Sequence, residues 1–156
     1  MSPLELGSTA PDFCTRNQHG ETVELSALRS APVLLVFYPF AFTGICSGEL
    51  ADLQLALPAL RGAGVRLLAV STDTMFTLRV FAEREHYEFD LLSDHWPHGQ
   101  IASAYGVFDA DLGCAVRGSF LLDADGVLRW KVVNQIGEAR DVTAHLAALT
   151  GSGLSA

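Results

Sequence analysis

The chain has 156 residues, 49% of them hydrophobic, so it is long enough to bury a core and fits one domain over residues 1–156. Eighteen acidic against ten basic residues give a formal net charge of −8, which argues against nucleic acid or an anionic membrane as the main partner. The chain opens without a basic segment followed by an apolar one, and no stretch approaches a membrane span, so we expect a cytoplasmic protein.

Two apolar runs dominate the first half of the chain. Residues 33–38 and 65–71 lack polar alternation, which is typical of central strands covered on both faces. Leucines recur at helical spacing between the runs and predict a helix over residues 48–60 that kinks or stops near Pro58. Strand, helix and strand would form a βαβ unit.

The second half predicts a different arrangement. In chain order, its patterns indicate an amphipathic helix over 74–86, a short strand over 89–92, a loop over 93–99, a short helix over 101–105, strands over 119–122 and 127–133, and a closing helix over 138–149. Asp125-Gly126 between the last two strands is a strong hairpin signal. We expect residues 151–156 to be a flexible tail. A βαβ half followed by a ββα half predicts an α/β thioredoxin fold, with a central mixed β-sheet flanked by helices.

Cys46 stands at the junction of the first predicted strand and the first predicted helix. A cysteine in the first turn of a helix faces unpaired N–H groups and the positive end of the macrodipole, which favours its thiolate, the nucleophilic form. Thr43 lies three residues upstream, where its hydroxyl is expected to reach the sulfur on the same turn and either orient the thiolate or hydrogen-bond an incoming oxygen. This junction is the most specific chemical signal in the sequence.

The other candidate metal and redox patterns are weak. Three cysteines at wide, unequal spacing do not form a secreted disulfide framework, and there is no Cys-x-x-Cys for a zinc knuckle or a local dithiol. His95 and His98 with Asp94 are a thin ligand set, which a polar loop explains equally well. We therefore expect no metal at these residues.

Several short motifs agree with one another along the chain. They are Ala10-Pro11-Asp12-Phe13, Pro39-x-x-x-Thr43-x-x-Cys46, Leu91-Leu92-Ser93-Asp94, Tyr105-Gly106-Val107 and Arg117-Gly118-Ser119-Phe120. Together they resemble the peroxiredoxin family over about residues 5–149. The loops at residues 41–46 and 94–99 look most like the family's one-cysteine alkyl hydroperoxide reductase E group.

The resemblance implies a thiol-specific peroxidase. Cys46 would be the peroxidatic cysteine, Thr43 and Arg117 its activating partners, and Pro39 a shield for the pocket. The Cys46 thiolate would reduce hydrogen peroxide, alkyl hydroperoxides or peroxynitrite and become a sulfenic acid, with no metal and no organic cofactor. Weaker candidates for the substrate pocket are Ile45, Glu49, Phe42 and Trp96. The helix dipole alone would also explain an acidic residue such as Glu49 near the start of a helix.

How the sulfenic acid is recycled stays open at this point. Neither Cys14 nor Cys114 is at a resolving position of the common two-cysteine classes, so an external thiol, thioredoxin or a glutaredoxin-like protein is the expected reductant. Atypical two-cysteine recycling through Cys14 or Cys114 is the alternative. In a regular strand, Cys114 and Arg117, three residues apart, would point to opposite faces.

Two further possibilities concern assembly and function. The family often pairs subunits through loops near the active site, which implies a homodimer with Trp96 and Pro97 at the pocket rim or the interface. A redox sensor or holdase with incidental turnover, and a binding domain without peroxide chemistry, are the rival functions.

Overall fold

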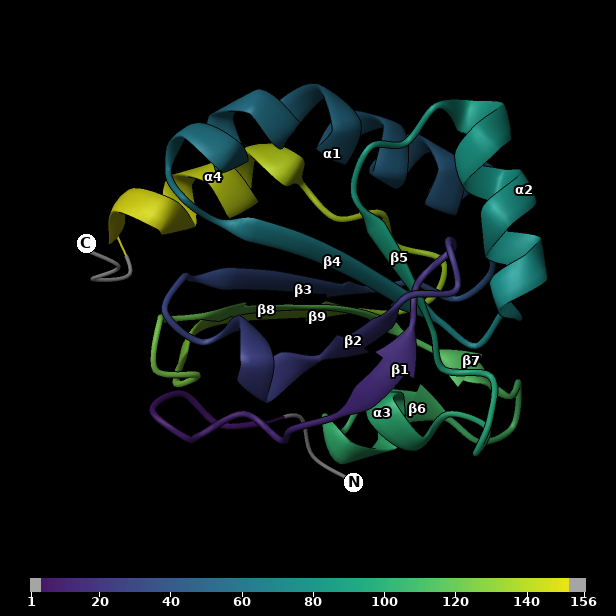
Figure 1. Ribbon diagram of the computed structural model, residues 1–156, viewed down its shortest axis with the longest axis horizontal. Coiled ribbons are helices and arrows are strands. Elements are labelled where there is room, and N and C mark those ends of the chain that lie inside the picture. The colour runs from purple at the N-terminus through teal and green to yellow at the C-terminus, as the bar shows by residue number, and fades with distance from the viewer. Residues whose placement is uncertain (1–3, 152–156) are drawn as a thin grey trace.

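A five-stranded mixed sheet forms the centre of the computed structural model, which describes residues 4–151 (Figure 1). Across the sheet the strands are β5 (Asp90–Ser93), β4 (Arg66–Ser71), β3 (Val33–Phe37), β8 (Arg117–Leu122) and β9 (Leu128–Asn134). β3, β4 and β5 run parallel, while β8 is antiparallel to β3 and forms a hairpin with β9. The predicted βαβ and ββα halves and their mixed sheet are present.

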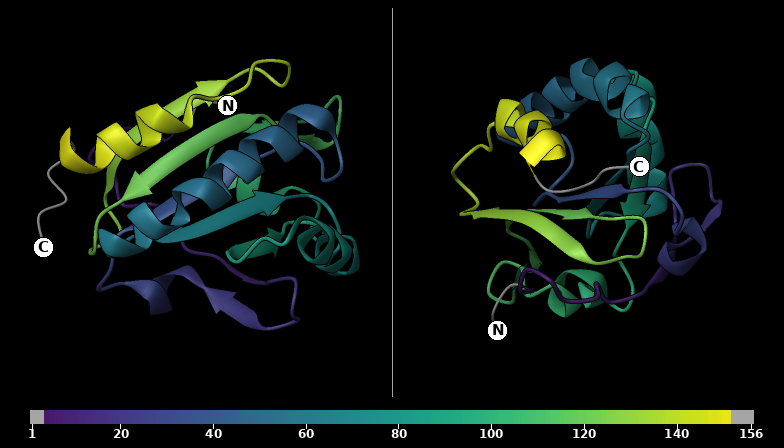
Figure 2. Two further views of the ribbon diagram at one scale, coloured as in Figure 1. Left: turned by 90° about the horizontal axis from the view of Figure 1, so that it is seen from above. Right: turned by 90° about the vertical axis from the view of Figure 1, so that its left-hand side faces the viewer.

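Helices and short strands cover the two faces of this sheet (Figure 2). One face carries α1 (Gly44–Gly62), α2 (Met75–Glu85) and α4 (Val142–Gly151). The other face carries the hairpin of β1 (Cys14–Arg16) and β2 (Thr22–Glu24), the 3-10 helix η1 (Leu25–Leu28), α3 (Gln100–Ala104), and β6 (Phe108–Asp109) paired with β7 (Cys114–Ala115). No helix within residues 4–151 is both long and apolar enough to cross a membrane.

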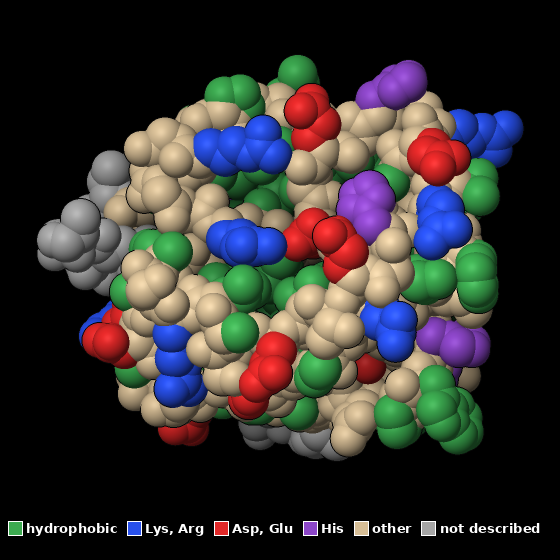
Figure 3. All heavy atoms as spheres, in the orientation of Figure 1, with side chains coloured by type: hydrophobic (Ala, Val, Ile, Leu, Met, Phe, Trp, Pro, Cys, Tyr) green, Lys and Arg blue, Asp and Glu red, His purple; other side chains and the backbone are tan. Residues whose placement is uncertain are grey.

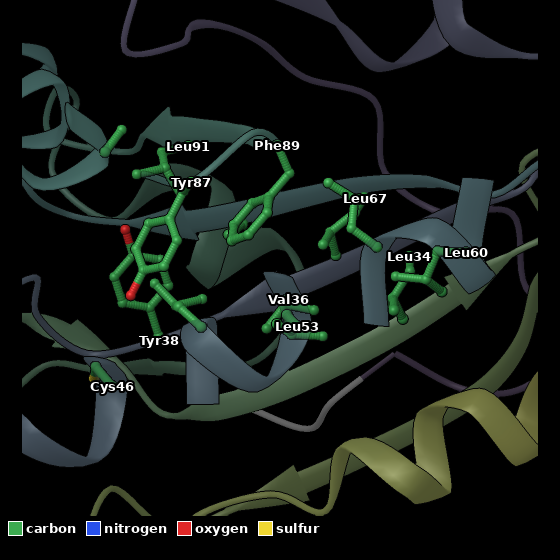
Figure 4. Packing of buried hydrophobic residues seen from close by; sticks show 14 of the residues in the cluster. Leu34, Val36, Tyr38, Cys46, Leu53, Leu60, Leu67, Tyr87, Phe89 and Leu91 are labelled. Carbon is green, nitrogen blue, oxygen red and sulfur yellow. The ribbon is translucent and has the colours of Figure 1, made fainter. Parts of the chain in front are cut away.

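The core follows the alternation of the central strand. Leu34 and Val36 of β3 point into a cluster beneath α1 and α2, part of which is drawn in Figure 4. Leu35 and Phe37 point into a second cluster on the opposite face. All five residues of β3 are buried, which confirms the prediction that this run is a strand covered on both faces.

The bounds of α1 differ from the prediction at both ends. The helix begins at Gly44, four residues before the predicted start, because its first turn carries glycines rather than the buried leucines that define the periodicity. It also continues through Pro58 to Gly62. A proline removes one helical hydrogen bond. Burial of Leu57 and Leu60, on either side of Pro58, offsets this loss and holds the last turn in place.

The closing helix starts later than predicted. α4 begins at Val142 rather than at residue 138, and Asp141 caps it by accepting a hydrogen bond from the Thr143 N–H at 2.9 Å. The Arg140 N–H donates instead to the side chain of Glu49, 91 residues away. Of the expected tail, Gly151 ends α4, and residues 152–156 lie outside the described part of the chain.

Candidate active site

Cys46 lies in the first turn of α1, directly beyond the end of β3 (Figure 4). Thr43 is the N-cap residue, with extended backbone, and Phe42 before it has a left-handed φ of 66°. The Cys46 residue is fully buried. Because the first amides of a helix have no partner within it, the N–H groups of Ile45 and Cys46 place positive partial charge around the sulfur.

Arg117 reaches this sulfur from the neighbouring strand. It is the first residue of β8, and β8 is antiparallel to β3, so the start of β8 lies beside the end of β3 where α1 begins. Arg117 Nη1 donates to Cys46 Sγ at 3.2 Å, and Nε donates to the Ile136 carbonyl at 2.6 Å. The side chain is only 3% exposed, so the charge lies beside the sulfur with little screening by water.

Glu49 connects this arginine to a second one. Its Oε1 accepts from Arg117 Nη1 at 2.5 Å and from Arg140 Nη2 at 3.0 Å. Its Oε2 accepts from the backbone N–H of Arg140 at 2.6 Å and from Nε at 3.0 Å. Burial raises the pKa of Glu49, but the hydrogen bonds and charges of Arg140 and Arg117 outweigh burial and hold that pKa below 4.5.

Arg140 is the site component that the sequence reasoning missed. Its neighbours, Glu138 to Asp141, are what an exposed, charged helix end would carry, and no local pattern marks the arginine as buried. The only available signal was indirect: a carboxylate on the core side of α1 needs a cationic partner. Arg140 is 6% exposed, and burial lowers its pKa while Glu49 opposes that shift.

Thr43 does not make the contact with the sulfur that its spacing suggested. Its hydroxyl donates to the Phe40 carbonyl at 2.9 Å, and within residues 4–151 it makes no hydrogen bond to Cys46 Sγ. The residue is exposed, and Ile45 and Phe42 beside it are 41% and 45% exposed. Pro39 is buried between β3 and this loop. The hydroxyl therefore lies at the exposed surface of this loop.

The remaining candidate residues are spread over the loops that follow the parallel strands. Phe42 packs on Phe81 of α2, with ring centroids 4.9 Å apart, and Trp96 is 84% exposed in the loop after β5. His98 contacts the Gly113 carbonyl and His95 the Thr72 carbonyl. The Asp94 carboxylate accepts hydrogen bonds from two backbone N–H groups at the start of α3. Among the described residues no group of three His, Cys, Asp or Glu side chains is arranged to hold a metal.

The other two cysteines have different surroundings. Cys14 is exposed on β1, across the sheet from α1 (Figure 1). Cys114 is buried in β7, where burial, followed by the charge of Asp109, raises the pKa of its thiol to about 11. β7 and β8 belong to different sheets, so Cys114 and Arg117 do not share the regular strand on which the opposite-face argument depends. All three thiols are free.

Most of the chain matches the model of one protein family. The model of the AhpC/TSA family matches residues 6–131. The chain belongs to this family of peroxiredoxins. It is therefore a thiol-dependent peroxidase, which confirms the activity that the resemblance implied; the comparisons do not favour the rival functions.

Individual relatives agree with this assignment. Alkyl hydroperoxide reductase E of Mycobacterium tuberculosis is 46% identical over 151 residues, covering 94% of this peroxiredoxin and 99% of the relative. Peroxiredoxin Bcp of Escherichia coli is 39% identical, covering 81% and 83%. The resemblance to the alkyl hydroperoxide reductase E group is thus confirmed.

Solved structures confirm the thioredoxin-type fold. Enterococcus faecalis AhpC superimposes with a TM-score of 0.88 at 25% identity, covering 94% of this chain and 91% of that one. Peroxidoxin BcpB from Mycobacterium tuberculosis superimposes with a TM-score of 0.85 at 29% identity, covering 95% and 97%.

Proposed function

We propose that Cys46 is the peroxidatic cysteine and that it reduces hydrogen peroxide, alkyl hydroperoxides or peroxynitrite. The observation that carries this proposal is the hydrogen bond of 3.2 Å from Arg117 Nη1 to the buried sulfur. Arg117 and Arg140 bring two positive charges to a buried cluster in which Glu49 supplies one negative charge. The cluster reaches neutrality when Cys46 is a thiolate, so the arrangement favours the nucleophile.

The reaction follows from this arrangement. The thiolate attacks one peroxide oxygen, a sulfur–oxygen bond forms as the oxygen–oxygen bond breaks, and the leaving alkoxide or hydroxide takes up a proton from water. Cys46 becomes a sulfenic acid. An alkyl hydroperoxide is reduced to an alcohol, hydrogen peroxide to water, and peroxynitrite to nitrite, which leaves without taking up a proton. Arg117 and the amides of Ile45 and Cys46 stabilise the negative charge as it moves from sulfur to oxygen.

The residues around the sulfur receive roles consistent with their positions. Thr43, whose hydroxyl is oriented by the Phe40 carbonyl, is placed to accept a hydrogen bond from an incoming hydroperoxide. The exposed Ile45 and Phe42 offer apolar contact for an alkyl group. Pro39, buried behind the loop, keeps water from the sulfur.

An external thiol, supplied by a small molecule or by a thioredoxin- or glutaredoxin-like protein, would reduce the sulfenic acid. Cys14 lies across the sheet from α1, and Cys114 is buried with a pKa of about 11, so neither is ready to attack the sulfenic acid. Free thiols throughout the described chain also fit a reducing compartment such as the cytoplasm.

We also propose a homodimer formed through an apolar rim, defined as Phe40, Phe42, Ile45, Trp96 and Leu112. The loops after β3 and β5 lie at the same edge of the sheet because these strands are parallel. Phe40, His95, His98 and Leu112 line one open hollow there. Figure 3 shows hydrophobic side chains gathered at the right-hand edge of the molecule, beside α2 and the loops below it.

The first test is intact mass after one equivalent of hydrogen peroxide, with a sulfenic acid trap present. Wild type should gain one trappable oxygen at Cys46, and Cys46→Ser should gain none and should not consume peroxide. Cys14→Ser is the matched control and should behave as wild type. A disulfide joining Cys46 to Cys14 or Cys114 would overturn external recycling, and full activity of Cys46→Ser would overturn the proposed function.

A further inference from the structure

A buried histidine stands at the far end of the arginine–glutamate network. His145 is in α4, is 2% exposed, and packs against the Trp130 ring with centroids 4.9 Å apart. His145 Nδ1 lies 2.8 Å from the Asp141 carbonyl, and Nε2 lies 2.7 Å from the Ser119 hydroxyl. Neither the motifs nor the proposed reaction gives this imidazole a role.

The hydrogen bonds fix which nitrogen carries the proton. A carbonyl can only accept, so Nδ1 donates to Asp141, and Nε2 of the neutral ring is left as an acceptor. The Ser119 hydroxyl therefore donates to Nε2. Its oxygen keeps its lone pairs for Arg140 Nη1, which donates to it at 3.2 Å. Every polar atom in this part of the chain of contacts then has a defined donor or acceptor role.

The contacts continue without a gap to the sulfur. Arg140 Nη1 also donates to the Gly118 carbonyl at 2.9 Å, and its other donors bind both oxygens of Glu49. Glu49 Oε1 in turn accepts from Arg117 Nη1, the atom that donates to Cys46 Sγ. Buried networks of this kind hold each member in one orientation only while all members are satisfied.

We propose that His145 is a positioning residue of the peroxidatic site, acting through Ser119, Arg140 and Glu49 on the orientation of Arg117. The neutral imidazole turns the Ser119 hydroxyl so that its oxygen faces Arg140. This inference rests on the proposed role of Cys46, because it assigns His145 a part in preparing that thiolate.

The charges around the imidazole agree with a neutral ring. Arg140, Glu49 and Asp141 are the charged groups that act on it. Burial lowers the pKa of His145, the hydrogen bond to the Asp141 carbonyl opposes that shift, and the Arg140 charge adds to it. A proton on Nε2 would remove the acceptor of the Ser119 hydroxyl and place a second cation beside Arg140.

Two conservative variants separate the acceptor role of His145 Nε2 from the donor role of Nδ1. His145→Gln keeps an acceptor near the Nε2 position, whereas His145→Asn keeps a donor near Nδ1 and loses the acceptor for Ser119. On the reduced full-length protein, we expect His145→Asn and Ser119→Ala to lower the second-order rate constant with hydrogen peroxide about fivefold. Both should also raise the pH midpoint of iodoacetamide alkylation at Cys46. His145→Gln should retain most of the wild-type rate, and exposed His19→Asn all of it.

Nitrogen-15 NMR of the wild-type imidazole gives a readout that does not depend on activity. The Nδ1-protonated neutral tautomer at pH 7 supports the proposal; the other tautomer or an imidazolium overturns it. Equal losses in His145→Asn and His145→Gln, or wild-type rates in a folded Ser119→Ala, would also overturn it. Cys46→Ser separates failure of the proposed function from failure of this inference. If Cys46→Ser still consumes peroxide, the proposed function is wrong. If Cys46→Ser is inactive and Ser119→Ala reacts at the wild-type rate, only the role of His145 is wrong.

Discussion

The guanidinium of Arg117 donates hydrogen bonds to three acceptors that lie in different directions. Nη1 faces both Cys46 Sγ and Glu49, and Nε faces the Ile136 carbonyl. A planar group with donors in a fixed fork can hold all three contacts at once. A lysine ammonium has the same charge but no such fork, so charge and geometry can be tested separately at this residue.

We expect Arg117→Lys to lower the second-order rate of Cys46 oxidation about tenfold or more, and Arg117→Met to lower it about a hundredfold, because both the charge and the donors beside the sulfur are lost. Stopped-flow oxidation of the pre-reduced protein measures both, with circular dichroism to verify folding. Arg129→Met is the matched control, since Arg129 is 46% exposed and pairs with Asp123. Wild-type oxidation rates in Arg117→Lys would show that the fork is not needed.

Some residues of the site could be predicted from the sequence, and others could not. Cys46 and Arg117 stand in recognisable motifs, and the structure brings them within 3.2 Å. Arg140 and His145 stand in no such motif, and each reaches its partner only through the packing of α4 and the segment before it against β8 and α1. Thr43 shows the opposite case: its spacing predicts contact with the sulfur, but its hydroxyl donates to the carbonyl of Phe40, on the other side of the left-handed Phe42.

At the scale of elements, Glu49 joins three parts of the fold. It extends from α1, accepts from Arg117 at the start of β8, and accepts from both the backbone and the side chain of Arg140 before α4. Removing one partner from such a buried cluster leaves the others without a counter-charge. The carboxylate therefore holds elements in place as well as balancing charge.

Glu49→Gln should lower the free energy of unfolding by about 3–5 kcal/mol at pH 7. The pKa of Glu49 is lowered in the folded state, so its contribution is full above pH 4.5 and disappears as the pH falls through the folded value. The difference between wild type and Glu49→Gln in urea unfolding should thus shrink on acidification.

Glu88→Gln is the control for this substitution. Glu88 is exposed and accepts one hydrogen bond from Gln54, so its change should alter stability little at any pH. Equal unfolding free energies for Glu49→Gln and wild type at pH 7 would show that Glu49 does not stabilise the packing of α1, β8 and the segment before α4.

Elements that carry their own signal were predicted, and those stabilised by distant contacts were not. β3 and β4 are continuous apolar runs, and α2 has a Thr74 N-cap and a left-handed His86 at its end, close to the predicted 74–86. β1, β2, β6 and β7 have two or three residues each and no hydrophobic pattern of that length. β1 is held from outside: the Thr15 hydroxyl donates to the Ser93 carbonyl.

At the scale of the whole molecule, the apolar rim lies along the loops at one edge of the sheet. Phe42, Ile45 and Leu112 are 45%, 41% and 60% exposed, and Trp96 is 84% exposed. The described chain has an accessible surface of 7434 Å². A standard interface covers about 800 Å² per partner, about a tenth of that surface. A second copy packed on Trp96 and Leu112 would remove the two most exposed of these side chains from water and leave Phe42 and Ile45 available to the substrate.

We expect the reduced wild type to sediment as a dimer at micromolar concentration, and Trp96→Lys and Leu112→Lys each to shift it toward monomer, because each variant would bury an unpaired ammonium in an apolar interface. Leu55→Lys is the matched control: Leu55 is 81% exposed on α1, beside α4 and outside the rim. Sedimentation velocity over a concentration series measures the dissociation constant. A monomeric wild type at those concentrations would contradict the dimer, and a loss caused equally by Leu55→Lys would place the interface on the α1–α4 face instead.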